Sequence, residues 1–188
     1  MTGLAWRRAN KKLDRPLLER FTCTVPAPRP TPQGRPLPHP KEWEWDVQSW
    51  LRSKALSSCA GPPALDPKLW LGLEDDVLVA CVAHSRVTEG QAADCLRRDC
   101  GFDGPIRLLL ALAVALTHRG RVTADAAMDH ALADVLLSED RAATFVIASI
   151  DRRNRASQRM VARNGFEFLE DDPVDPQLQR WYTIAEAE

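Results

Sequence analysis

Residues 115–132, ALTHRGRVTADAAMDHAL, combine a basic, glycine-containing turn with a helix-forming stretch. A strand is expected to end near Ala115, the chain reverses through Arg119 and Gly120, and a helix begins near Thr123. The first amides of a helix have no partner within it and lie at the positive end of its dipole. A phosphate or pyrophosphate suits that geometry, and arginines add charge-assisted hydrogen bonds. The turn therefore predicts a phosphate site, although many strand–turn–helix units bind nothing.

A second group of residues lies on a predicted helix about thirty residues farther along the chain, NRASQRMVARNG. Helical spacing places Asn154 and Ser157 on one face of it, and Gly165 and Phe166 follow directly. Each polar residue also has an ordinary role, because Asn154 suits a helix N-cap and Ser157 suits a neutral surface position.

Together the two stretches resemble the GNAT superfamily of acyl-CoA-dependent N-acyltransferases. Residues 119–124, RGRVTA, are similar to its loop pattern R/Q-x-x-G-x-G/A, with Arg119 first and Ala124 last. Residues 112–115 match the end of its fourth strand, and residues 154–166 match its N-x-x-A/S helix followed by Gly-Phe. The resemblance covers residues 16–184 by element order and 106–169 by motif. Both motifs, in this order and at this separation, are more specific than either one.

The resemblance implies an α/β (mixed α+β) fold, with a central mixed, mostly antiparallel sheet and helices on both faces. It implies acetyl-CoA as co-substrate and no metal ion. The pantetheine arm would bind the strand backbone like an added strand, the pyrophosphate would bind the loop amides, and the helix residues would lie beside the CoA. The cofactor-binding residues predicted in this way are Leu112, Val114, Arg119, Gly120, Arg121, Val122, Thr123, Ala124, Asn154 and Ser157.

The sequence departs from the family pattern at three positions. Val122 replaces the middle glycine of the loop, and a β-branched residue resists positive φ and holds a ligand farther away. Val161 stands where many members of the family carry a tyrosine as general acid. Asp125 in the first helical turn suits the helix dipole but would repel a nearby phosphate. The first and third departures bear on cofactor affinity, and the second bears on the proton donor.

The acid and base of an acyl transfer must then come from elsewhere, because the strand before the loop, RLLLALAV, has no carboxylate. Orientation supplies much of the rate of such a reaction, and a positioned acid and base add to it. His84 is the candidate base because histidine titrates near neutrality, with Glu74 and Asp75 as alternatives. Tyr182, the only tyrosine, is the candidate acid for the leaving sulfur. Purely structural roles for His84 and Tyr182 stay open.

The elements that must position these groups follow from hydrophobic periodicity and from chain breakers. Strands are expected over residues 16–25, 69–73, 77–85, 106–115, 143–150, 166–170 and 180–184. Helices are expected over residues 41–56, 91–98, 124–137 and 154–165. Residues 26–40, with proline at nearly every second position, should form an extended surface loop, with an SH3-type ligand as the alternative. Four tryptophans could line an acceptor pocket or belong to the core: Trp43, Trp45, Trp50 and Trp181.

The chain has 188 residues, 45% of them hydrophobic, which predicts a globular protein. We expect a flexible basic arm over residues 1–14 and a single domain over residues 15–188. A net charge of −1 argues against nucleic-acid and acidic-membrane partners. The absence of a long apolar run and of a signal-type N-terminus predicts a cytoplasmic protein. The five cysteines suggest no disulfide framework, and Cys95 and Cys100 lack the partners of a zinc site.

The leading interpretation is an N-acetyltransferase that moves an acetyl group from acetyl-CoA to a primary amine of a small molecule, protein or peptide. Val122 and Val161 favour an alternative, a catalytically degenerate domain that acts as an acyl-CoA-binding or regulatory module. A further alternative is a toxin-like acetyltransferase directed at tRNA. The basic arm and the stretch WEWDVQSWL prompt that interpretation, whereas the near-neutral charge counts against it. The sequence does not identify the acceptor, and it leaves a homodimer open.

Overall fold

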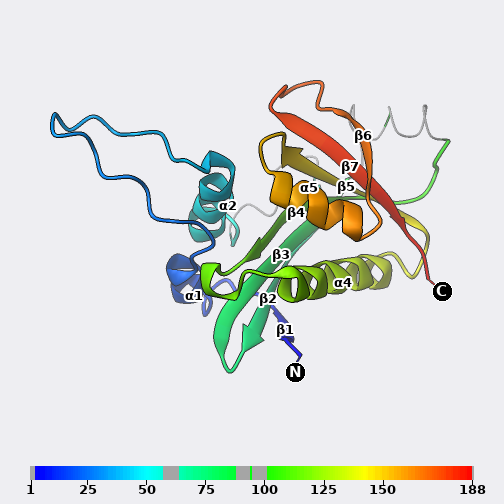
Figure 1. Ribbon diagram of the computed structural model, residues 1–188. Coiled ribbons are helices and arrows are strands. Elements are labelled where there is room, and N and C mark those ends of the chain that lie inside the picture. The colour runs from blue at the N-terminus through cyan, green and yellow to red at the C-terminus, as the bar shows by residue number, and fades with distance from the viewer. Residues whose placement is uncertain (1–2, 57–63, 88–93, 95–100, 188) are drawn as a thin grey trace.

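The computed structural model describes residues 3–56, 64–87, 94 and 101–187 and is built around one mixed sheet (Figure 1). Its seven strands lie in the order β1-β2-β3-β4-β5-β7-β6, and all neighbours are antiparallel except β4 and β5. The predicted α/β class with a mostly antiparallel sheet is confirmed. The strands are β1 (Ala5–Arg8), β2 (Ala64–Glu74), β3 (Val77–Val87), β4 (Ile106–Val114), β5 (Thr144–Asp151), β6 (Glu167–Asp171) and β7 (Leu178–Ala185).

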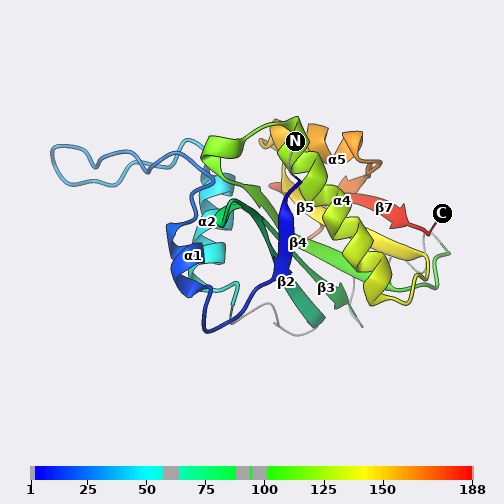
Figure 2. The same cartoon turned by 90° about the horizontal axis from the view of Figure 1, so that it is seen from below.

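Helices cover both faces of this sheet (Figures 1 and 2). Helices α1 (Arg15–Arg20) and α2 (Glu42–Ser53) pack on one face, where Leu51 joins a core with Ala111 and Ala113 of β4. Helices α4 (Arg121–Ser138) and α5 (Arg155–Arg163) pack on the other face, where Met128 and Met160 join a core with β5. None of the helices in the described part of the chain is long and apolar enough to cross a membrane.

The N-terminal segment differs from the prediction. Residues 16–25 were expected to form a strand, but α1 begins there and is followed by irregular chain. Pro16 explains the difference, because proline is well suited to the first turn of a helix. The arm predicted to be flexible contains β1, which pairs with β2. Arg7 of β1 also donates to the buried carboxylate of Asp14 (2.6 Å), which ties this strand to the start of α1.

The other described elements follow the prediction, with ends shifted by a few residues. The predicted hairpin is β2 and β3, and its two turn residues, Asp75 and Asp76, both have positive φ, as a type I′ turn requires. Helix α5 ends before Gly165, whose φ is +80°. Helix α4 begins at Arg121, three residues earlier than expected. The short helix predicted over residues 91–98 lies outside the described residues apart from Asp94.

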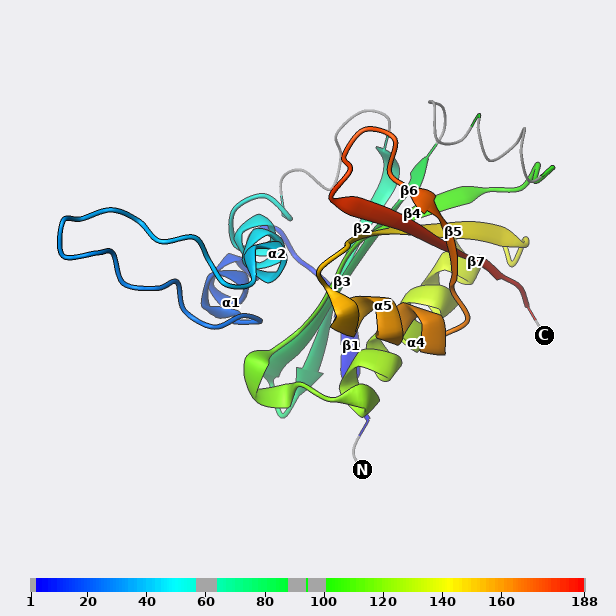
Figure 3. The same ribbon diagram turned by 45° about the horizontal axis from the view of Figure 1, so that its top comes forward.

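The proline-rich segment, residues 26–40, extends away from the sheet as a long loop, in agreement with the prediction (Figures 1 and 3). At its tip the Thr31 N–H donates to the Arg35 carbonyl (2.9 Å). At its base a ring nitrogen of His39 lies 2.9 Å from the Val25 carbonyl oxygen. The loop therefore leaves and rejoins the body of the protein at one place, directly before α2.

Candidate active site

Strands β4 and β5 pair over only four residue pairs, from Ile106–Phe145 to Leu109–Ala148. The register of β3 and β4 shifts at the same point and leaves Leu110 as the extra residue of a β-bulge. Beyond the bulge β4 stays beside β3 and β5 stays beside β7, so the two strands part. A cavity of about 700 Å³ is lined by residues of both strands and of α2 and α5. Figure 3 shows α2 and α5 at different sides of the place where the two strands part.

Two of the predicted residues, Leu112 and Val114, present their backbone to this cavity. The Ala115 N–H donates to the Val79 carbonyl of β3 (2.7 Å). Backbone groups point to alternate sides along a strand, so Ala113 also faces β3, whereas Leu112 and Val114 turn their N–H and C=O groups toward the gap. Both residues line the cavity. Such a free strand edge can pair with an extended chain that carries amide groups.

The basic turn ends at the N-terminus of α4, in the wall of the same cavity. Gly120 is the N-cap residue, and its carbonyl accepts a hydrogen bond from the Ala124 N–H (3.3 Å). No described side chain caps this helix end. The amides that precede Ala124 in the first turn have no intrahelical acceptor and lie at the positive end of the helix dipole. Because Gly120 and Ala124 both line the cavity, these amides can serve an anion bound there.

Val122 occupies this turn without strain. It is the second residue of α4, its φ is not positive, and the residue is 62% exposed. The position therefore does not require the conformation that only glycine adopts readily. Gly120 has an extended φ of 166°, and a Cβ placed on it would meet nothing within 4 Å. A ligand can therefore approach the backbone closely at Gly120.

The Arg119 side chain, expected to contact a phosphate, is held by α2 instead. Its guanidinium donates to the Cys23 carbonyl and to Oε2 of Glu44 (2.6 Å). Glu44 also accepts a hydrogen bond from Lys41 (3.2 Å). Burial of Glu44 disfavours its ionised form, but Arg119 and Lys41 outweigh this effect and hold its pKa below the usual range. Arg119 therefore joins the basic turn to the helix across the cavity.

Asn154 and Ser157 line the cavity opposite the turn. Asn154 is the N-cap of α5, and its Oδ1 accepts a hydrogen bond from the Ser157 N–H (3.2 Å). This ordinary role leaves the Asn154 Nδ2 without a partner among the described residues. Val161 is 1% exposed, packs in the core with Phe166 and also lines the cavity. This part of α5 thus offers an amide donor but no acid at position 161.

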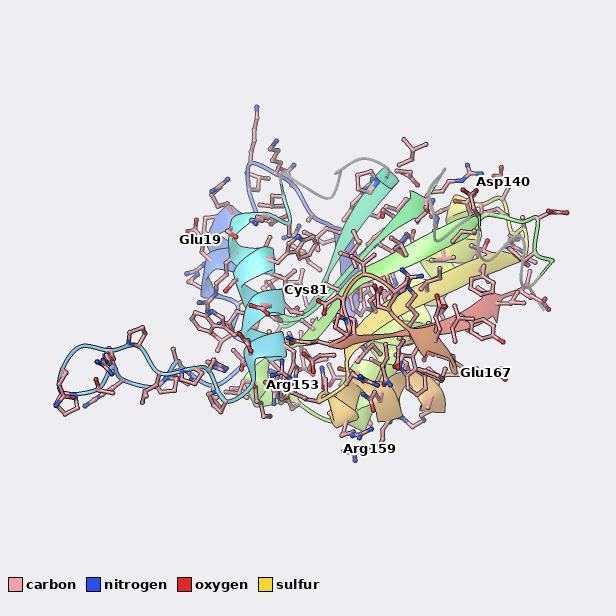
Figure 4. All side chains as sticks on the ribbon, turned by 90° about the horizontal axis from the view of Figure 1, so that it is seen from above. Glu19, Cys81, Asp140, Arg153, Arg159 and Glu167 are labelled. Carbon is pink, nitrogen blue, oxygen red and sulfur yellow. The ribbon has the colours of Figure 1, made fainter. Side chains whose placement is uncertain are left out.

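The negative charge of Asp125 is compensated by α5. Arg163 donates to its carboxylate at 2.5 Å, and the Asn164 Nδ2 donates at 3.0 Å. Arg159 and Arg163 both line the cavity, and Figure 4 shows Arg159 on α5. The repulsion that the sequence suggests between Asp125 and a phosphate is therefore offset by these neighbouring cations.

His84 does not lie at the cavity. Its side chain is fully buried, with Nε2 2.8 Å from Asp134 of α4 and Nδ1 3.0 Å from a guanidinium nitrogen of Arg107. Burial is the main cause that lowers its pKa, and the Arg107 charge adds to the effect. The alternative bases Glu74 and Asp75 lie at the turn between β2 and β3 and do not line the cavity either.

Tyr182 also lies outside the cavity lining. Its ring stacks on Phe145 with centroids 4.8 Å apart, and its hydroxyl donates to Glu167 (3.0 Å). Figure 4 shows Glu167 well separated from Arg153, which does line the cavity. The structure brings seven of the predicted cofactor residues to one cavity: Leu112, Val114, Arg119, Gly120, Ala124, Asn154 and Ser157. Val122 and Thr123 belong to the first turn of α4 but do not line the cavity, and neither do His84 and Tyr182.

Trp43, one of the four tryptophans that the sequence made candidates for an acceptor pocket, lines the cavity, together with α2 residues that the sequence did not single out. The Arg153 guanidinium lies over the Trp43 ring, 5.0 Å from its centroid. Arg153 in turn donates to Asp151 (2.8 Å) and holds the pKa of that carboxyl below its usual range. The α2 residues that line the cavity are Glu42, Trp43, Glu44, Asp46 and Val47.

The other tryptophans considered for an acceptor pocket lie elsewhere. Trp45 stacks on His39 at the base of the proline-rich loop, and Trp50 and Trp181 pack against the core. Within the described ranges no group of three or more histidine, cysteine, aspartate or glutamate side chains could hold a metal ion. Cys95 and Cys100 lie outside those ranges.

Comparison with known proteins gives no matching family model and no matching curated protein. Solved structures do match over nearly the whole chain. A structure described as a bacterial toxin has a TM-score of 0.66 at 12% identity and covers 98% of this chain and 92% of its own. The GNAT domain of S. lividans PAT has a TM-score of 0.59 at 15% identity, with coverages of 96% and 90%.

PaiA N-acetyltransferase from Thermoplasma acidophilum, solved in complex with coenzyme A, has a TM-score of 0.60 at 12% identity and coverages of 97% and 99%. Identities this low establish the arrangement of the elements and nothing about the acceptor. The parted strands, the helix N-terminus beside them and these structural matches lead to one conclusion: the chain has the fold of the GNAT acetyltransferases.

Proposed function

We propose that this protein is an N-acyltransferase that moves an acetyl group from acetyl-CoA to a primary amine. One observation carries the proposal: a single cavity joins the free edge of β4 to the uncapped N-terminus of α4. A CoA thioester has the two matching parts, a pantetheine arm with amide groups and a pyrophosphate. A strand edge recognises the first, and helix amides recognise the second.

The order of these elements gives acetyl-CoA a direction in the cavity. β4 runs toward the basic turn, so a pantetheine paired with Leu112 and Val114 has its pyrophosphate end at Gly120. Its thioester end then lies back toward Leu110, where β4 and β5 meet. Asn154 and Ser157 of α5 also line the cavity, and the Asn154 Nδ2 can donate to a pantetheine carbonyl.

The chemistry that follows depends mainly on orientation. A neutral amine attacks the thioester carbonyl and forms a tetrahedral intermediate. The nitrogen gives its proton to water, the C–S bond breaks, and CoA leaves as a thiolate or thiol. Holding the amine and the thioester in line removes much of the entropic barrier. Val161 cannot donate a proton, so we assign the proton on the leaving sulfur to water rather than to α5. The acceptor enters past α2, where Trp43 and several carboxylates line the cavity.

A second candidate function is acyl-CoA binding without turnover. The apolar Val161 favours it, as does the placement of His84 and Tyr182 away from the cavity lining. In this case the protein would use the same cofactor groove for binding or regulation. The two candidates differ only in what happens after acetyl-CoA has bound.

Calorimetry with acetyl-CoA, followed by a thiol-release assay over a panel of primary amines, tests the proposal. Binding together with thiol release that depends on an amine supports the acyltransferase. Binding without release by any amine favours the binding module. If the folded protein bound neither acetyl-CoA nor CoA, both candidates would be excluded.

A further inference from the structure

The guanidinium of Arg119 lies between the proposed phosphate site and the acceptor wall. In sequence Arg119 directly precedes Gly120, the N-cap of α4. In space its Nη2 donates to Oε2 of Glu44 on α2 at 2.6 Å. The Glu44 side chain is 15% exposed and that of Arg119 is 36% exposed, and both line the cavity. A carboxylate therefore already pairs with the arginine that directly precedes the amides proposed to hold a pyrophosphate.

A bound pyrophosphate would compete with Glu44 for this guanidinium. Phosphate oxygens match the planar fork of arginine and carry more negative charge than one carboxylate. The helix amides would fix the phosphate next to Arg119, so its binding would need little movement of the chain. Because Arg119 is partly exposed, solvent screens its ion pair with Glu44, and breaking this pair costs little free energy.

We infer that binding of acyl-CoA transfers the Arg119 guanidinium from Glu44 to the pyrophosphate, and that Glu44 then faces the acceptor side of the cavity as a freed carboxylate. This inference rests on the proposed function. Glu44 lowers the affinity for CoA in the free protein, because it neutralises Arg119 and adds negative charge near the phosphate. Acyl-CoA therefore binds first, and the acceptor amine binds second.

The surroundings of Glu44 favour a cation once Arg119 has moved. Lys41 still reaches it at 3.2 Å, but Lys41 is well exposed and its pairing is weak. Glu42 and Asp46 line the same wall of α2, so the wall carries several negative charges. A protonated amine is attracted to such a wall, and Glu44 acts there as a positioning residue that draws the acceptor toward the thioester.

The direction in which Glu44→Gln changes the affinity for CoA tests whether Arg119 is transferred. Glu44→Gln keeps the shape of the side chain and removes its charge, so CoA should bind more tightly, by roughly fivefold, in calorimetry. If Glu44 only held α2 in place, the substitution would leave CoA binding unchanged or weaken it. Glu170→Gln is the matched control, since Glu170 also pairs with an arginine (Arg180, 2.9 Å) but does not line the cavity. CoA affinity should not change in that variant.

A double-mutant cycle with Arg119 assigns the effect to this pair. Arg119→Gln should weaken CoA binding, and in that background Glu44→Gln should lose most of its gain. An equal gain in both backgrounds would overturn the transfer.

With the amine that gives the fastest thiol release, Glu44→Gln should raise KM more than it lowers kcat. A wild-type protein that does not bind CoA contradicts the proposed function itself, whereas CoA binding that Glu44→Gln does not strengthen contradicts only the transfer.

Discussion

A guanidinium nitrogen of Arg107 donates to Nδ1 of His84 across 3.0 Å, and this bond fixes the tautomer of a fully buried histidine. Arginine has no acceptor, so Nδ1 must accept and the proton must lie on Nε2. Nε2 then donates to Asp134 at 2.8 Å. Protonation of Nδ1 would break the bond to Arg107 and place two positive charges side by side. His84 is therefore held neutral in the folded protein.

This arrangement predicts that acidification destabilises the fold. The pKa of His84 is lowered in the folded state, so below about pH 6.5 the unfolded chain takes up a proton that the folded protein resists. The free energy of unfolding should fall as the pH drops through 6.5 toward the lower folded pKa. The pKa of Asp134 is about 2, because the His84 and Trp70 hydrogen bonds outweigh its burial, so its own titration lies below this window.

Denaturant unfolding at pH 7.5, 6.5 and 5.5 measures this dependence. His84→Gln keeps a donor near Asp134 but cannot titrate, so its stability should vary less with pH than that of the wild type. His39→Gln, at the base of the proline-rich loop, is the control and should keep the wild-type dependence. An unchanged pH dependence in His84→Gln would show that another group is responsible.

Gly120→Ala should weaken CoA binding without destabilising the protein. The free protein has room for the added methyl group, and the extended φ of Gly120 suits any residue. A pyrophosphate held by the helix amides would meet that methyl, and the affinity should fall on the order of tenfold. Calorimetry and thermal unfolding measure the two quantities. Gly3→Ala, which also has open space around it, is the control. Equal CoA affinity in Gly120→Ala and the wild type would exclude the proposed loop.

Val122→Gly should raise CoA affinity modestly, because it removes an exposed side chain next to the proposed pyrophosphate. Glycine in a helix costs roughly 0.5–1 kcal/mol relative to alanine, so this variant should also be less stable than Val122→Ala. Comparing the two variants separates removal of the side chain from loosening of the helix. If neither bound CoA more tightly than the wild type, the Val122 side chain would not limit access to the loop.

Tyr182→Phe should leave kcat close to the wild-type value. The sequence made Tyr182 the candidate acid by elimination, but its hydroxyl donates to Glu167 and its ring stacks on Phe145, outside the cavity lining. Steady-state thiol release at saturating acetyl-CoA measures the effect. A fall in kcat of roughly a hundredfold, with CoA affinity unchanged, would restore the tyrosine as general acid.

The part of the fold that bears the motifs could be predicted because its information is local. β4, the basic turn, α4, β5 and α5 follow one another along the chain, and each has its own periodicity or turn residues. Asn154 and Gly165 mark the two ends of α5 in the sequence as they do in the structure. The sequence placed the start of the helix after Val122 and therefore treated position 122 as one that favours a positive φ. The helix begins at Arg121, so position 122 needs a helical φ.

The rest depends on contacts between distant parts of the chain. Arg119 and Glu44 are 75 residues apart, and neither residue type indicates the other as its partner. His84 lies on a strand, as predicted. Its buried hydrogen bonds are made to Arg107 of β4 and Asp134 of α4, which lie far from it in the sequence. The first strand was misplaced because Leu17, Leu18 and Phe21 are compatible with either element, and Pro16 favours the helix.

The short pairing of β4 with β5 has a consequence for the cooperativity of the whole fold. The sheet consists of two smaller antiparallel sheets, one of β1, β2, β3 and β4 and the other of β5, β7 and β6. Only the four residue pairs between β4 and β5 join them, and these pairs act as a hinge. The amides of Leu112 and Val114 that face the gap lie beyond this hinge. A pantetheine arm that paired with them would lie where an eighth strand would fit, and it would also contact α5 on the far side. Such a ligand would link the two halves of the sheet mechanically, and the halves would then resist separation and unfold together as one unit.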